Sequence, residues 1–221
     1  MLLRTRRILA LSLLITPIAN AQPTYEAMNK NAQLISAAKR NQIDLLERAL
    51  KNGAAPNSRN RNGDTPLNLA ARNGNLDMVR LLLDAGANVN QANLEKITPL
   101  MSAAFHGNAE IVKILMEKGA DAAAADQSRK TAMVLAAGSG KSNVVKALLE
   151  FGQGANTRYQ NDLTALMWAV GSGDAETVKV LLDAKADPNL RDNRGKTALA
   201  MARELGHQQV IDLLQAADVK Q

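Results

Sequence analysis

The 221-residue chain contains no cysteine and few aromatic residues: one Trp, two Tyr and two Phe. The lack of cysteine excludes disulfides, thiolate metal sites and a lipid anchor attached through sulfur. With so few rings, the core must be built from Ala, Leu and Val, a composition that suits thin, closely packed helices. Only two histidines are present, His106 and His207, far apart in sequence. No H-E-x-x-H, G-x-S-x-G or EF-hand pattern appears, so we expect no catalytic residue, no metal site, no cofactor and no enzyme activity.

The charges do not point to nucleic acid. The formal net charge is +6, but Arg4, Arg6 and Arg7 contribute half of it, and the remaining basic residues interleave with 21 acidic ones. A nucleic-acid-binding protein is expected to cluster its Lys and Arg on one face. The sequence therefore gives no reason to expect a nucleic-acid partner.

The first 21 residues have the three parts of a secretory signal peptide. The three arginines are followed by an apolar stretch, Ile8 to Ile15, and by Ala19-Asn20-Ala21, which places small residues where a signal peptidase cleaves. The alternative is an uncleaved anchor, but the apolar run of about 12 residues is shorter than the roughly 20 that span a bilayer. We expect cleavage before Gln22, no stable membrane insertion afterwards, and a location in a Gram-negative periplasm. The absence of Cys and of Asn-x-Ser/Thr sequons also fits that compartment.

A repeat of 33 residues is the strongest signal in the sequence. Thr recurs at this spacing, Gly follows nine residues after each Thr, and Leu follows seventeen after. The Thr is expected to cap a first helix, and the Gly to end it in a left-handed turn. A second helix then carries Val and Leu toward the core and ends at another Gly, which Lys185 replaces in one unit. The Thr residues that fix this phase are Thr65, Thr98, Thr131, Thr164 and Thr197.

The segment Asn62-Gly63-Asp64-Thr65-Pro66-Leu67-Asn68-Leu69-Ala70-Ala71 resembles the ankyrin consensus. The resemblance implies an all-α solenoid of helix–turn–helix units whose tips are short β-turns or hairpins. We expect a linker over 22–30 and an ankyrin repeat domain over 31–218. The units would span 31–58 (a degenerate N-terminal cap), 59–91, 92–124, 125–157, 158–190 and 191–218.

The segment Gly138-Ser139-Gly140-Lys141-Ser142 looks like a phosphate-binding loop. Such a loop needs a Gly five residues before the Gly-Lys pair and a strand before it. Leu135 stands at that position, and Gly140 is the Gly that the repeat requires after the first helix. We therefore interpret the segment as a turn between two helices.

By resemblance to ankyrin proteins, the partner-binding surface is the concave face, formed by the turn tips and the exposed side of each first helix. The residues expected to contact a partner there are Arg72, Leu94, Ile97, Phe105, His106, Arg158, Tyr159 and Leu163. Several are apolar where exposure is expected, and aromatic residues ringed by Arg are typical of interface hot spots. The alternative for Phe105 is packing within the stack.

Four small residues, Gly138, Ser139, Gly171 and Ser172, are expected to leave a hollow on this face, with Trp168 as its floor or packed in the stack. The leading hypothesis is a monomeric periplasmic adaptor or accessory protein that binds another protein. The alternative is binding of a small anionic ligand, cofactor or envelope polymer in the hollow, which Arg72, Arg158 and Arg191 would edge. Fold alone does not identify the partner.

Overall fold

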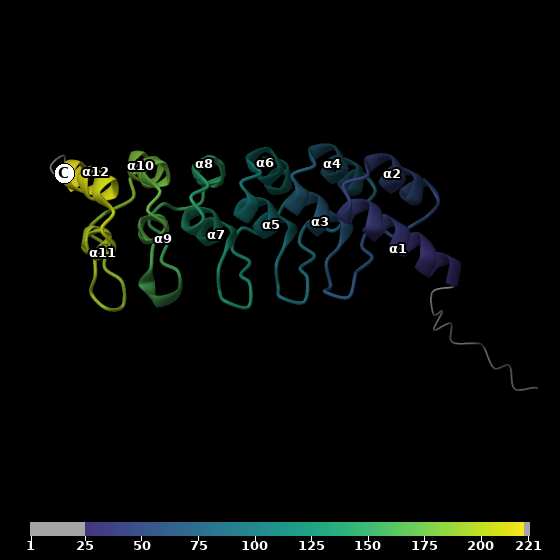
Figure 1. Ribbon diagram of the computed structural model, residues 1–221, viewed down its shortest axis with the longest axis horizontal. Helices are drawn as coiled ribbons and strands as arrows, with labels where there is room; N and C mark the ends of the chain where they lie inside the picture. The colour runs from purple at the N-terminus through teal and green to yellow at the C-terminus, as the bar shows by residue number, and fades with distance from the viewer. Residues whose placement is uncertain (1–24, 219–221) are drawn as a thin grey trace, which may run out of the picture.

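The computed structural model describes residues 25–218, which form twelve α-helices, one short 3-10 helix and no β-strand. Figure 1 shows that the odd-numbered and even-numbered helices form two parallel rows, with the loops between successive pairs projecting to one side. The predicted all-α helical solenoid is confirmed. The tips are turns, with no strand assigned in the part of the chain described. The predicted signal peptide lies outside the described residues.

The helices follow one another as six helix–turn–helix pairs. The first row contains α1 (Tyr25–Lys39), α3 (Pro66–Asn73), α5 (Pro99–His106), α7 (Ala132–Gly138), α9 (Ala165–Ser172) and α11 (Ala198–Leu205). The second row contains α2 (Ile43–Lys51), α4 (Leu76–Asp84), α6 (Ala109–Glu117), α8 (Ser142–Glu150), α10 (Ala175–Asp183) and α12 (Gln208–Asp218). The 3-10 helix η1 covers Gln160–Asp162. Because α1 begins at Tyr25, residues 25–30 of the predicted linker are helical.

Each first helix after α1 starts at the Thr that the repeat predicts. The Thr65 hydroxyl accepts a hydrogen bond from the backbone N–H of Asn68 at 3.1 Å, and the other four threonines do the same for the residue three positions on. Pro66 and Pro99 occupy the first helical turn, where a missing N–H leaves no hydrogen bond unmade. The cap therefore fixes where every first helix begins.

The Gly that ends the first helix has two roles. At Gly173 the backbone is left-handed (φ 72°), which a side chain disfavours. The next unit also packs directly on this residue: a Cβ there would lie 2.8 Å from His207 Cε1. His207 is thus a packing residue on the turn. The same turn between α7 and α8 contains the Gly-Ser-Gly-Lys-Ser segment, which joins two helices and follows no strand.

A single apolar core runs along the stack between the two rows. Paired alanines such as Ala103 and Ala104 are fully buried and let neighbouring first helices approach closely. Large core side chains such as Leu82, Leu115 and Leu148 come from the second helices. The first helices also bury large aliphatic side chains such as Leu67 and Leu100, so that Ala, Leu, Val and Met fill the core with few rings. The tips are thereby held on a rigid support.

Candidate functional site

We define the tip face as the turns that precede each capping Thr together with the last turn of each first helix. Most tips are built on an Asn or Asp five residues before the Thr. The Asn60 side-chain oxygen accepts from the backbone N–H groups of Asn62 (2.8 Å) and Asp64 (2.9 Å). Asn93 and Asp192 occupy the same position and each accept two equivalent bonds, whereas Asp126 accepts one, from the Lys130 N–H. These bonds replace a strand ladder and rigidify the tip.

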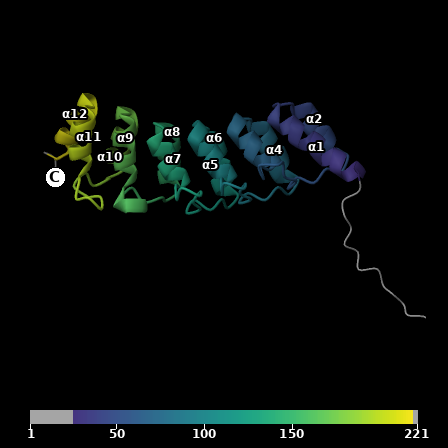
Figure 2. The same cartoon turned by 60° about the horizontal axis from the view of Figure 1, so that its bottom comes forward.

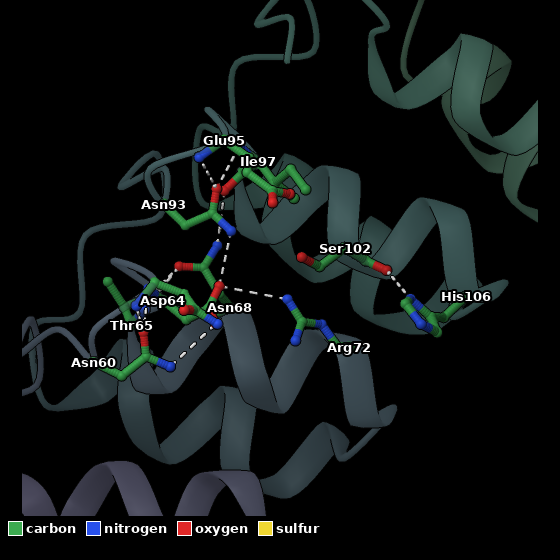
Figure 3. Close-up of polar contacts among 11 residues, drawn as sticks. Asn60, Asp64, Thr65, Asn68, Arg72, Asn93, Glu95, Ile97, Ser102 and His106 are labelled. Carbon is green, nitrogen blue, oxygen red and sulfur yellow. Dashed lines mark hydrogen bonds and ion pairs between the residues drawn. The ribbon is translucent and has the colours of Figure 1, made fainter. Parts of the chain in front are cut away.

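Polar contacts connect the second and third tips around a buried carboxylate (Figure 3). Asp64 accepts from Asn93 Nδ2 at 2.8 Å and from Asn60 Nδ2 at 3.1 Å, and it lies 3.4 Å from Arg72 Nη2. A buried carboxylate requires such partners. Arg72 was predicted as a partner-binding residue, and the structure pairs it with Asp64, with its side chain half-buried. Its role is therefore at least partly internal.

The third unit presents exposed apolar side chains on the tip face. Leu94 is 64% exposed and Phe105 is 49% exposed, although both are large and hydrophobic. Phe105 meets the His106 ring edge to face, with centroids 5.2 Å apart, and His106 Nδ1 lies 2.9 Å from the Ser102 carbonyl oxygen. Ile97 is half-buried, and its carbonyl accepts from Asn68 Nδ2. Phe105 is therefore an exposed residue, and it does not belong to the core of the stack.

The fifth tip departs from the others because Tyr159 stands where they have Asn or Asp. The Tyr159 N–H still donates to the Leu163 carbonyl at 2.9 Å. The phenol cannot accept from the following N–H groups as the Asn and Asp side chains do, and the tip forms the 3-10 helix instead, with Asn161 and Asp162 at φ 61° and 59°.

Backbone hydrogen bonds join successive tips, except between the fourth tip and the fifth. Leu94 N–H donates to the Asn62 carbonyl, Gln127 to Glu95, and Asn193 to Asn161, at 3.0–3.2 Å. Within residues 25–218 no equivalent bond joins the fourth tip to the fifth. The gap left at this junction opens into a pocket.

The pocket has a volume of about 140 Å³ and lies between the fourth and fifth tips. Val134, Leu163, Tyr159 and Trp168 supply its apolar walls, and Lys130 Nζ lies 5.4 Å from the centre of the Trp168 ring. Its remaining lining residues are Ser128, Arg129, Gln160 and Asn161. The structure thus brings the predicted residues Tyr159 and Leu163 together at one place.

Burial raises the pKa of Tyr159, while hydrogen bonds with the Thr131 and Thr157 side chains act in the opposite direction. The phenol is therefore neutral at physiological pH and forms a fixed wall of the pocket. Trp168 is half-buried and its buried Nε1 lacks a hydrogen-bond partner among the described residues.

The hollow that the sequence predicts between four small residues differs from this pocket. Gly138 packs against Trp168, so that an added Cβ would lie 3.4 Å from Cε3, whereas Gly171 faces open space. Neither Gly nor the serines beside them line the pocket. The tips on either side line it instead. Arg129 contributes here although the repeat pattern did not mark its position, where two other units have Gly.

Arg158 and Arg191, which were predicted to edge the hollow, are held by contacts within and between the tips. Arg158 Nη1 donates to the Arg191 carbonyl at 2.9 Å and lies 4.0 Å from Asp162. Arg191 Nη1 donates to the Gly195 carbonyl at 2.8 Å. These contacts leave no convergent set of cations for a small anion.

Larger hollows of about 500 Å³ lie away from the tips, one between α4, α6 and α8 and one between α10 and α12. Lysines and acidic residues mix in their walls, without a paired nucleophile and base. Within residues 25–218 no group of three or more His, Asp or Glu side chains is placed to hold a metal ion. The helices described there are also too short or too polar to cross a membrane.

Comparison with known families agrees with this architecture. A family model for ankyrin repeats, in three copies, matches residues 34–126 and again 133–221. The chain therefore belongs to the ankyrin repeat family. Proteins of this family generally act through protein–protein interaction. A search of curated proteins gives no match.

Proposed function

We propose that the chain is exported to the periplasm and binds another protein there through its tip face, as an adaptor or accessory to that protein. The exposure of Leu94 and Phe105 in the third unit carries the proposal. Single exposed apolar residues are common on protein surfaces. Here two large ones occur in one unit, on the face from which the tips project, and a rigid solenoid supports them.

The arrangement of the polar groups favours a protein over a small anion. The alternative hypothesis required Arg72, Arg158 and Arg191 to converge on a ligand. Each of them is engaged by a carboxylate or a carbonyl of the tips. An aromatic side chain beside an imidazole is instead typical of a contact surface for another polypeptide. Export is supported by the composition of residues 1–21.

A capture experiment with two matched variants tests this function. The purified protein is used to retain partners from periplasmic extract, and these are identified by mass spectrometry. Phe105→Ala is expected to lower partner capture at least about 10-fold, the effect of losing about 1.4 kcal/mol at a hot spot. Phe151→Ala is the control, because Phe151 is also exposed (37%) but follows α8 in the second row.

The helical melting curve of both variants should match that of the wild type, because neither side chain is core. Equal loss of capture in both variants, or full capture by Phe105→Ala, would contradict a tip-face site. The export proposal is tested separately by N-terminal sequencing of the secreted protein. A mature start at Gln22 is expected, and a start at Met1 would refute it.

A further inference from the structure

We propose that the pocket between the fourth and fifth tips receives one apolar side chain of an acidic polypeptide segment, whose carboxylates meet Arg129 and Lys130 at the rim. This inference rests on the proposed function and specifies the chemistry of the partner.

The size and walls of the pocket fit a single side chain. A cavity of about 150 Å³ with apolar walls accommodates a benzene ring, and this pocket has about 140 Å³. Val134 and Leu163 offer aliphatic contacts, and Tyr159 and Trp168 offer aromatic ones. A Leu or Phe side chain therefore fits, whereas a longer ligand would extend beyond the pocket along the tips.

The pocket results from a specific departure from the repeat. At the other internal junctions of this face, a backbone hydrogen bond joins one tip to the next. Tyr159 replaces the Asn or Asp that organises the tip, and its half-buried ring becomes a wall of the pocket. The same substitution thus accompanies the opened gap and supplies an aromatic surface in it.

The charge at the rim selects for an acidic segment. Arg129 is exposed and Lys130 is half-buried, and among the described residues neither forms an ion pair. The nearest acid in the turn, Asp126, accepts from the Lys130 backbone N–H. On the facing tip, Asp162 lies 4.0 Å from Arg158, which offsets its charge. Because neither cation is paired with a carboxylate among the described residues, they favour carboxylates beside the inserted side chain.

Peptide display on the purified protein tests this inference. Random seven-residue peptides are selected for binding, and the affinity of enriched peptides is measured from the fluorescence of Trp168, the sole tryptophan. The expected sequences combine one Leu, Phe or another large apolar residue with neighbouring Asp or Glu. Tyr159→Asp removes the wall and restores the residue type of the other tips, and it should weaken binding at least about 10-fold.

The chain offers a matched pair of variants for the rim charge. Arg129 and Lys96 occupy equivalent tip positions, both exposed and both left-handed (φ 59° and 62°), and Asn tolerates that conformation. Arg129→Asn should weaken peptide binding about 2- to 5-fold at low salt, as loss of an exposed ion pair does. Lys96→Asn, one tip away from the pocket, should leave it unchanged.

Three outcomes would overturn the inference: no enriched peptide, enriched peptides that tolerate both Tyr159→Asp and Arg129→Asn, or tighter binding of a single-stranded oligonucleotide that ignores Tyr159→Asp. The last would mean that the basic tips attract polyanions in general. A protein partner lost with Phe105→Ala but retained by Tyr159→Asp would refute this inference and leave the proposed function standing. Failure to capture any protein would refute the function itself.

Discussion

Lys185→Gly is expected to stabilise the protein. Lys185 stands where four other units have Gly, and it adopts their left-handed conformation, φ 65° against 80–85° at Gly53, Gly86, Gly119 and Gly152. A residue with a Cβ pays about 1–2 kcal/mol for this conformation, whereas Gly costs about 0.4–1 kcal/mol in extra unfolded-chain entropy. The difference predicts a net gain of about 0.5–1 kcal/mol in the free energy of unfolding.

The contacts of Lys185 do not change this expected gain in the free energy of unfolding. The hydrogen bonds of Lys185 are made by its backbone: its N–H donates to the Leu182 carbonyl (2.9 Å), and its carbonyl accepts from Asn156 Nδ2 (3.2 Å). Both survive the substitution. The side chain is exposed and forms no ion pair within the described residues. Conformation is therefore the dominant effect.

Urea unfolding followed by circular dichroism measures the change in the free energy of unfolding. The midpoints of the two proteins can be compared if the dependence of that free energy on urea concentration is unchanged. Gly119→Ala is the reverse control: its Cβ would meet nothing within 4 Å, so it tests the conformational cost without a clash. It should destabilise the protein by about 0.5–1 kcal/mol, because the strain of the left-handed conformation exceeds the gain from a less flexible unfolded chain. Loss of stability in Lys185→Gly, or no loss in Gly119→Ala, would refute the left-handed assignment of these turns.

Three further outcomes follow from buried contacts. Gly173→Ala should cost about 2–4 kcal/mol in urea unfolding, because strain adds to a Cβ contact at 2.8 Å from His207; a smaller loss than Gly119→Ala would contradict this. Asp64→Ala should cost about 2–3 kcal/mol, since Asn93 loses a buried acceptor; wild-type stability would show the network to be dispensable. The pKa of Asp192 is lower in the folded protein than in the unfolded chain. The ionised Asp192 should therefore protect the amides of its tip from hydrogen exchange above the unfolded pKa, and this protection should be lost as the pH falls through the folded pKa. Burial opposes that lowering, but N–H groups of Lys196 and Arg194 and the Arg194 guanidinium outweigh it. In Asp192→Asn this pH dependence should vanish.

The phase of the repeat was enough to predict the helices and their ends. Thr164 and Gly173 carry the same signals as their equivalents, and the structure uses them as cap and turn. The start of α1 was not predictable in this way, because the first unit lacks the Thr and the sequence before Asn31 has no repeat phase. A helix over 25–30 depends on local propensity, which the periodic pattern does not report.

The candidate site was predictable only in part. The exposure of Phe105 follows from its position in the repeat, and the structure agrees. The pocket was expected between small residues of the first helices, but it lies between tips. Its origin is a missing hydrogen bond between two turns. Sequence shows that Tyr159 is unusual for its position, but it does not show which neighbouring backbone groups then separate.

Two rows of hydrogen bonds join successive units. The first row consists of the backbone bonds between neighbouring tips, and the second lies at the ends of the second helices. In the second row, an Asn side chain donates through Nδ2 to the backbone carbonyl just after the second helix of the following unit, at 3.1–3.2 Å. The donors are Asn57, Asn90 and Asn156. Ala123 occupies the position where the fourth such Asn would stand. The junction before the fourth unit thus lacks one row, and the junction after it lacks the other.

In a linear array each unit is stabilised only by its neighbours. We expect the two missing hydrogen bonds to weaken the coupling of the fourth unit to the unit on either side of it. The pocket lies at the second of these junctions. A ligand that bridges the fourth and fifth tips would therefore replace the missing connection and restrict the angle between these two units.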